Sequence, residues 1–102
     1  MKTQARVVVI GGGALGVGLL YHLTKLGWTD VVLVEKGELT SGSTWHAAGG
    51  MHTINGDPTV AKLQKYTIDL YQEIEEASGQ SVGLHVTGGV LLAATPERFD
   101  WL

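Results

Sequence analysis

Hydrophobic positions divide the first part of the chain into two continuous runs with one periodic run between them. Residues 7–10 and 31–34 are unbroken stretches of valine, isoleucine and leucine, which predicts strands buried on both faces of a parallel sheet. Between them, leucines recur at helical spacing, at Leu19, Leu20, Leu23 and Leu26. This spacing predicts a helix over residues 14–26 that stops at Gly27. The order strand, helix, strand is that of a β-α-β unit.

The second part of the chain predicts one long helix and two short strands. Residues 57–58 are an aspartate and a proline, a cap followed by the residue favoured at the first helical position. Apolar residues continue at helical spacing up to Ser78–Gly79, the expected stop. Residues 84–87 and 90–93 read as short strands around two glycines, either a tight hairpin or one strand with a glycine bulge. Residues 95–96 predict the start of a further helix.

A glycine-rich turn joins the first strand to the first helix, and it reads Gly11-Gly12-Gly13-Ala14-Leu15-Gly16. Gly11 permits a tight turn, Gly13 leaves room for a pyrophosphate, and Gly16 lets the helix pack close to the strand. The amides that begin the helix would face the phosphates. Glu35 follows Gly16 by 19 positions (35 − 16), near the roughly 20 expected for the acid that binds a ribose 2′-hydroxyl. The spacing predicts a dinucleotide site and disfavours NADP, whose 2′-phosphate a carboxylate would repel.

Residues 38–50 follow this acid and lack both helical and strand periodicity. They are rich in glycine, serine and threonine, with Trp45 and His46 in their middle. Small residues leave amides and hydroxyls free for an extended polar ligand, and the segment lies where the rest of a dinucleotide would extend. A flexible linker is the alternative, although a linker has little use for adjacent tryptophan and histidine.

Composition and charge limit the classes of partner that the chain is expected to bind. The chain has 102 residues, a net charge of −3 and no cysteine, so we expect neither nucleic acid nor a membrane surface as a partner, and no disulfide. His46 and His52 lack further ligands at useful spacing, so no metal is expected. The apolar run at 7–10 is too short for a signal peptide or a membrane span, and the expected location is cytoplasmic.

Two strong strands are fewer than the five or six usual in a dinucleotide-binding sheet. Residues 1–102 therefore read as a truncated N-terminal part of a larger protein. We divide it into residues 1–56, the β-α-β unit and following loop, and residues 57–102, the packing helix, short strands and start of a helix. Unpaired sheet edges would favour self-association.

The segment from Gly11 to Gly50 resembles the D-amino-acid-oxidase-type FAD oxidoreductases, most of all the dimethylglycine dehydrogenase and sarcosine dehydrogenase group. The glycine turn, residues 31–36 and the run Leu39-Thr40-Ser41-Gly42-Ser43-Thr44-Trp45-His46-Ala47-Ala48-Gly49 carry the resemblance. It continues through residues 63–79 and 87–89. The fold that it implies is α/β, a Rossmann-type FAD-binding β-α-β unit at the start of a larger FAD/NAD(P)-binding fold.

The resemblance also implies the site and the reaction. Cofactor contacts are implied at Gly11, Gly13, Ala14, Leu15, Gly16, Glu35 and Lys36, and at Gly42, Ser43, Thr44, Trp45, His46, Ala47, Ala48, Gly49 and Gly50. His46 matches the histidine joined covalently to the flavin 8α-methyl; alternatively it only lies beside the flavin ring or is hydrogen-bonded in the loop. The implied reaction is oxidation of a small N-methyl amine by hydride transfer to FAD, with electrons leaving to a flavoprotein acceptor. Substrate-contacting residues would lie beyond residue 102, so no catalytic residue is assigned.

Two other functions stay open at this point. An NAD-dependent oxidoreductase would use the same β-α-β unit but gives no role to residues 41–50. A truncated, non-catalytic module could instead dock on a partner through its exposed sheet edge.

Overall fold

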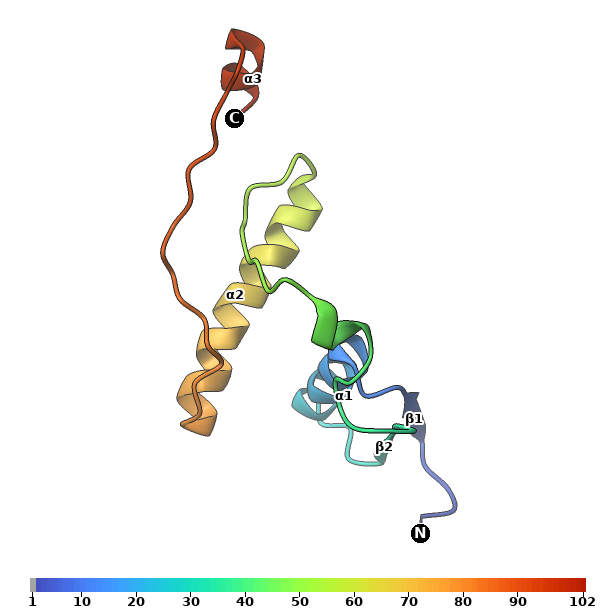
Figure 1. Cartoon of the computed structure of the whole chain (residues 1–102). Helices are drawn as coiled ribbons and strands as arrows, with labels where there is room; N and C mark the ends of the chain where they lie inside the picture. The colour runs from blue at the N-terminus through green and yellow to red at the C-terminus, as the bar shows by residue number, and fades with distance from the viewer. Residues whose placement is uncertain (1) are drawn as a thin grey trace. The chain divides into compact units, whose positions relative to one another are not determined.

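The computed structural model describes residues 2–102, which form two strands, three α-helices and one short 3-10 helix (Figure 1). The chain divides into two compact units, Met1–Gly50 and Met51–Leu102. Within the described residues, no helix combines the length and the apolar character needed to cross a membrane.

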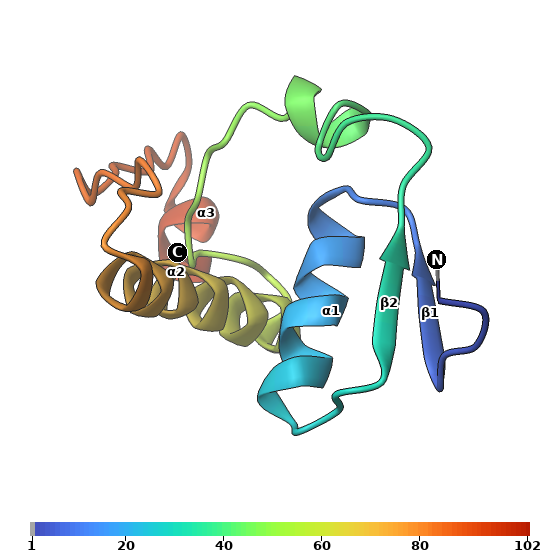
Figure 2. The ribbon, with the colours of Figure 1, turned by 90° about the horizontal axis from the view of Figure 1, so that it is seen from below.

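The first unit is a β-α-β unit, as the hydrophobic pattern predicts. Strand β1 (Val7–Ile10) pairs in parallel with β2 (Val31–Val34), in a register that runs from Val7 opposite Val31 to Ile10 opposite Val34. Helix α1 (Ala14–Lys25) connects them and runs alongside the sheet (Figure 2). The chain leaves the helix through Gly27, whose φ of 85° is the left-handed conformation that glycine adopts without strain. The predicted helix is confirmed to within one residue.

Burial of both strands on two faces is a prediction that the structure contradicts. Val9 is 6% exposed, whereas Val8 is 51% and Ile10 is 88% exposed. Successive side chains of a strand point to opposite faces, and α1 covers the face that contains Val9. Within the described residues of Met1–Gly50, no other helix or strand covers the opposite face. Two leucines of the predicted apolar stripe are also exposed, namely Leu19 on α1 and Leu26, which directly follows the helix.

The second unit is built on the predicted long helix α2 (Pro58–Ser78), followed by α3 (Pro96–Trp101). Asp57 caps α2, because its Oδ1 accepts hydrogen bonds from the amides of Thr59 at 2.7 Å and Val60 at 3.1 Å. Gly79 ends the helix in the left-handed region with a φ of 67°. Both ends confirm the sequence prediction.

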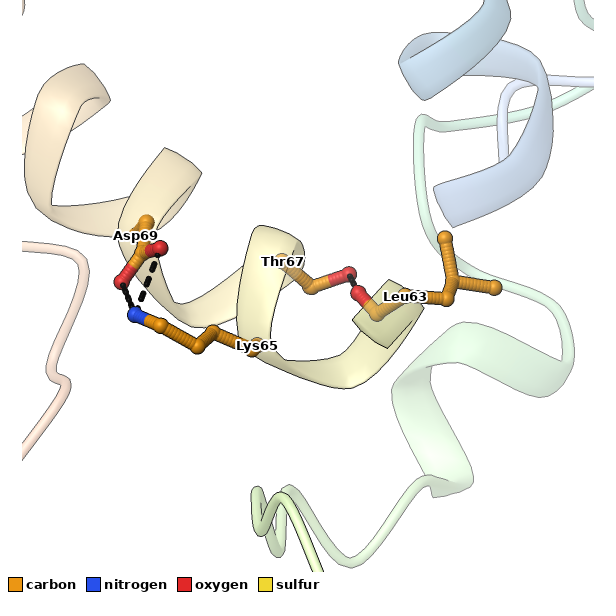
Figure 3. A network of polar contacts seen from close by, with 4 residues as sticks. All are labelled: Leu63, Lys65, Thr67 and Asp69. Carbon is orange, nitrogen blue, oxygen red and sulfur yellow. Dashed lines mark hydrogen bonds and ion pairs between the residues drawn. The ribbon is translucent and has the colours of Figure 1, made fainter. Parts of the chain in front are cut away.

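Polar side chains on α2 interact along the helix (Figure 3). The Lys65 ammonium donates to both oxygens of Asp69 at 2.9 Å, and the Thr67 hydroxyl donates to the Leu63 carbonyl at 2.8 Å. Within Met51–Leu102, α2 and α3 make no extensive contact with each other, and the role of α2 as a packing helix stays a prediction.

The two strands predicted at residues 84–87 and 90–93 are wrong. The structure gives residues 80–93 no regular secondary structure, and Val86, Val90 and Leu92 are between 75% and 88% exposed. A strand needs a partner for its backbone N–H and C=O groups. Within the described residues neither the hairpin nor another strand pairing forms here, so the short apolar runs around the two glycines do not by themselves produce strands.

Candidate functional site

The candidate site is the turn Gly11–Gly16, which we call the glycine corner, and residues 38–46 contact it. It lies where β1 ends and α1 begins. Gly11 has a φ of 104°, and its amide donates to the Val34 carbonyl at 2.8 Å, which joins the corner to the end of β2. Ligands of open parallel α/β sheets bind at the carboxyl ends of the strands, and the corner occupies that edge.

Gly16 sets the close approach of helix and strand. A Cβ atom at this position would lie 1.8 Å from the Gly11 carbonyl oxygen and 3.5 Å from Cγ1 of Val9. The first of these neighbours is backbone, which has no rotamer through which to move away. The packing role that the sequence predicts for Gly16 is confirmed.

Glu35 points into the corner. Its Oε2 accepts a hydrogen bond from the Gly12 amide at 2.6 Å, and its Oε1 accepts one from the Gly37 amide at 2.9 Å. These amides, the Gly12 amide above all, lower the pKa of the Glu35 carboxyl group because they stabilise its charged form. The acid is therefore ionised at neutral pH. Each carboxylate oxygen can accept a further bond, so both remain able to bind a sugar hydroxyl.

Residues 38–46 fold back onto the corner instead of forming a featureless loop. Ser43–His46 make one turn of 3-10 helix, which the lack of periodicity did not predict. The Thr44 hydroxyl accepts a hydrogen bond from the Ala14 amide at 2.9 Å, and the Thr40 amide donates to the Gly12 carbonyl at 2.9 Å.

Sequence reasoning named Thr44 but missed Leu39 and Thr40. The available signal was slight, because Leu39 is an isolated apolar residue in a polar run. Thr40 has a φ of 65°, which is unusual for a residue other than glycine.

The structure brings six of the predicted cofactor contacts to the corner: Gly11, Gly13, Ala14, Gly16, Glu35 and Thr44. Leu15 is also there, although its side chain is 91% exposed and only its backbone can serve. The others lie on exposed parts of the chain beyond β2, namely Lys36, Gly42, Ser43, Trp45, His46, Ala47, Ala48, Gly49 and Gly50. His46 stands at the end of the 3-10 helix with its side chain exposed.

The donor set of the corner fits the ADP half of a dinucleotide. Helix α1 begins without a side-chain cap at Gly13, and the hydrogen bonds among residues 2–102 supply no acceptor for the Leu15 and Gly16 amides. Uncapped amides at a helix N-terminus, with the positive end of the helix dipole, suit a pyrophosphate. The Glu35 carboxylate supplies the acceptors that a ribose diol needs.

A second hollow lies within the other unit. It has a volume of about 580 Å³ and an apolar lining from residues 51–54 and 84–91, with Ile68 of α2. His52 and His85 are on its wall. Across residues 2–102, histidines and acids nowhere gather in threes that could hold a metal ion. The hollow contains none of the cofactor contacts predicted from the sequence.

Among families of known proteins, the one described as FAD dependent oxidoreductase matches residues 6–102 of the chain. The chain is 52% identical over 99 residues to the mitochondrial dimethylglycine dehydrogenase of Rattus norvegicus. These residues are 97% of the chain and 12% of the relative. It is 40% identical over 102 residues to the 4-methylaminobutanoate oxidase (formaldehyde-forming) of Paenarthrobacter nicotinovorans, covering 100% of the chain and 12% of the relative.

A third relative is the mitochondrial sarcosine dehydrogenase of Homo sapiens, at 41% identity over 101 residues, with 98% of the chain and 11% of the relative covered. The chain thus spans only 11–12% of the length of these three relatives.

Proposed function

The chain belongs to the family of FAD dependent oxidoreductases, and from this membership we propose that it forms the part of an amine-oxidising flavoenzyme that binds the ADP half of FAD. The resemblance that the sequence suggested is thereby confirmed at the level of the family. We further propose that the mixed α/β unit, with its two parallel strands, is the start of a larger FAD/NAD(P)-binding fold.

One observation carries the proposal: the ionised Glu35 and the Leu15 and Gly16 amides, which have no acceptor among residues 2–102, meet at the same glycine corner. Glu35 accepts from the Gly12 amide at 2.6 Å, while the amides of Leu15 and Gly16 are directed along the start of α1. The first group would bind the adenosine ribose and the second the pyrophosphate. Lys36 and residues 42–50 would extend along the ribityl chain toward the flavin.

Bound FAD would supply the acceptor for a hydride taken from the carbon beside the amine nitrogen. The chain's own contribution is to bind and orient that cofactor. His46, on the exposed end of the 3-10 helix, is the proposed point of covalent attachment, and an imidazole nitrogen is a competent nucleophile for this role. Catalytic residues are not assigned to this chain.

The proposed substrate is a small N-methyl amine. Dimethylglycine, sarcosine and 4-methylaminobutanoate, in the names of the three relatives, share a methyl group on an amine nitrogen. A flavoprotein electron acceptor, a cytoplasmic location and self-association through the open sheet edges stay predictions from the sequence.

The test is the mass of the chain under denaturing conditions after incubation with FAD. We expect the wild-type chain to bind FAD and to retain its added mass after denaturation. His46→Ala should bind FAD but lose it on denaturation, and the matched control His52→Ala should behave as the wild type. Flavin that is bound but released by the wild type would refute the covalent role. Binding of NAD in place of FAD would refute the flavin assignment and favour the NAD-dependent alternative.

A further inference from the structure

Gly12 is a closely packed glycine of the corner, although the dinucleotide fingerprint assigns roles only to Gly11, Gly13 and Gly16. Gly12 is buried. Its amide donates to Glu35 at 2.6 Å, and its carbonyl accepts from the Thr40 amide at 2.9 Å. Both of its backbone polar groups are therefore engaged inside the chain.

Leu39 occupies the space that a side chain on Gly12 would need. A Cβ atom at Gly12 would lie 2.5 Å from Cδ2 of Leu39 and 3.1 Å from Cβ of Glu35. Leu39 is 59% exposed overall, yet its methyl end is seated against the glycine. Since dispersion contacts fall off steeply with distance, this seat exists because residue 12 has no side chain.

Residues 39–46 are attached to the glycine corner at two points. Thr40 bonds to Gly12, and Thr44 accepts from the Ala14 amide at 2.9 Å. The Trp45 amide donates to the Thr40 carbonyl at 3.1 Å, which ties the two attachment points together. These bonds connect Thr40, the neighbour of Leu39 in the chain, to the 3-10 helix that ends at His46.

We propose that Gly12 and Leu39 form a socket that docks residues 39–46 on the glycine corner, and that both are positioning residues for the cofactor site. The socket places the Thr44 hydroxyl over the start of α1 and fixes where His46 stands. Its importance for the cofactor rests on the proposed FAD function, but the docking itself is a property of the chain without any ligand.

The substitution Gly12→Ala tests the socket, because the added methyl group would displace the flexible end of Leu39. In the ligand-free chain, we expect hydrogen exchange at the Thr40 and Ala14 amides to accelerate by roughly tenfold, an effect within the range for directly contacting residues. The Gly11 amide, which bonds to Val34, reports whether the corner itself is still folded. It should keep its protection.

Leu39→Ala provides the rescue. In a chain that already carries Leu39→Ala, adding Gly12→Ala should change exchange at Thr40 and Ala14 by less than about threefold, because the only neighbour closer than 3.0 Å to the added methyl group is gone and Cβ of Glu35 lies at 3.1 Å. Equal effects of Gly12→Ala in both backgrounds would overturn the proposal, as would unchanged exchange in Gly12→Ala alone.

Should Gly12→Ala also lose protection at Gly11, Leu39→Ala alone decides the matter. That variant removes the seated methyl groups without adding bulk, so exchange at Thr40 and Ala14 should accelerate severalfold. Leu26→Ala, at a leucine that is 76% exposed, is the control and should change neither. If Leu39→Ala behaves as this control, the socket does not exist. Because no step uses FAD, failure here is distinguishable from failure of the wild-type chain to bind FAD.

Discussion

Two glycines of α1, Gly16 and Gly18, should respond to alanine with opposite signs. A methyl group at Gly18 would have no atom within 4 Å apart from its chain neighbours and the nearby backbone of α1, whereas one at Gly16 would lie 1.8 Å from the Gly11 carbonyl oxygen. Alanine is favoured over glycine in a helix by about 1 kcal/mol. Gly18→Ala should therefore raise the free energy of unfolding by up to about that amount.

At Gly16 the steric cost exceeds the gain in helix propensity. The contact must open by about 1.2 Å, from 1.8 Å to the 3.0 Å below which real Cβ atoms are essentially never found. The neighbour is backbone at the left-handed Gly11, which is held to β2 by the bond to Val34. Overpacking of this kind costs typically 1–3 kcal/mol and occasionally more. We therefore expect Gly16→Ala to lower the free energy of unfolding by about 3 kcal/mol.

Thermal unfolding followed by far-UV circular dichroism measures both variants. With roughly 4–8 °C per kcal/mol for a domain of this size, Gly16→Ala should melt at least about 10 °C below the wild type. Gly18→Ala should melt a few degrees above it, since the gain is about 1 kcal/mol at most. A Gly16→Ala chain as stable as the wild type would refute the close helix–strand packing on which the corner depends.

Three further predictions concern charged side chains. The pKa of Glu35 is lowered by the amide hydrogen bonds that it accepts, so its stabilisation of the fold is complete above its unfolded pKa and is lost as pH falls through the folded pKa. The free energy of unfolding should therefore fall more steeply on acidification for the wild type than for Glu35→Gln. Equal slopes would contradict this. Asp57→Ala should reduce the helical circular dichroism of α2 by removing its cap, whereas Asp57→Ser should retain most of it. Lys65→Ala should change the free energy of unfolding by less than about 0.5 kcal/mol, because the ion pair with Asp69 is exposed on both sides; a larger loss would show that Lys65 has another role.

The sequence by itself determined the elements whose signals are local. The continuous runs at residues 7–10 and 31–34 predicted strands, because branched side chains favour the extended backbone, and the helix between them made the pair parallel. Asp57 and Gly79 fixed the ends of α2, because a cap and a left-handed residue act on the nearest turn alone. The position of Glu35 at the tip of β2 followed from its spacing to Gly16.

Only the tertiary structure decided which groups meet across the chain. The seat of Leu39 on Gly12 joins residues 27 positions apart (39 − 12), and the bond from Ala14 to Thr44 joins residues 30 apart. Hydrophobic periodicity along the sequence does not predict such contacts, because they form only when residues 38–46 fold back onto the glycine corner. The same reason explains the wrong strands at residues 84–87 and 90–93: short apolar runs beside glycines favour strands, but a strand forms only when a partner supplies the other half of its hydrogen bonds.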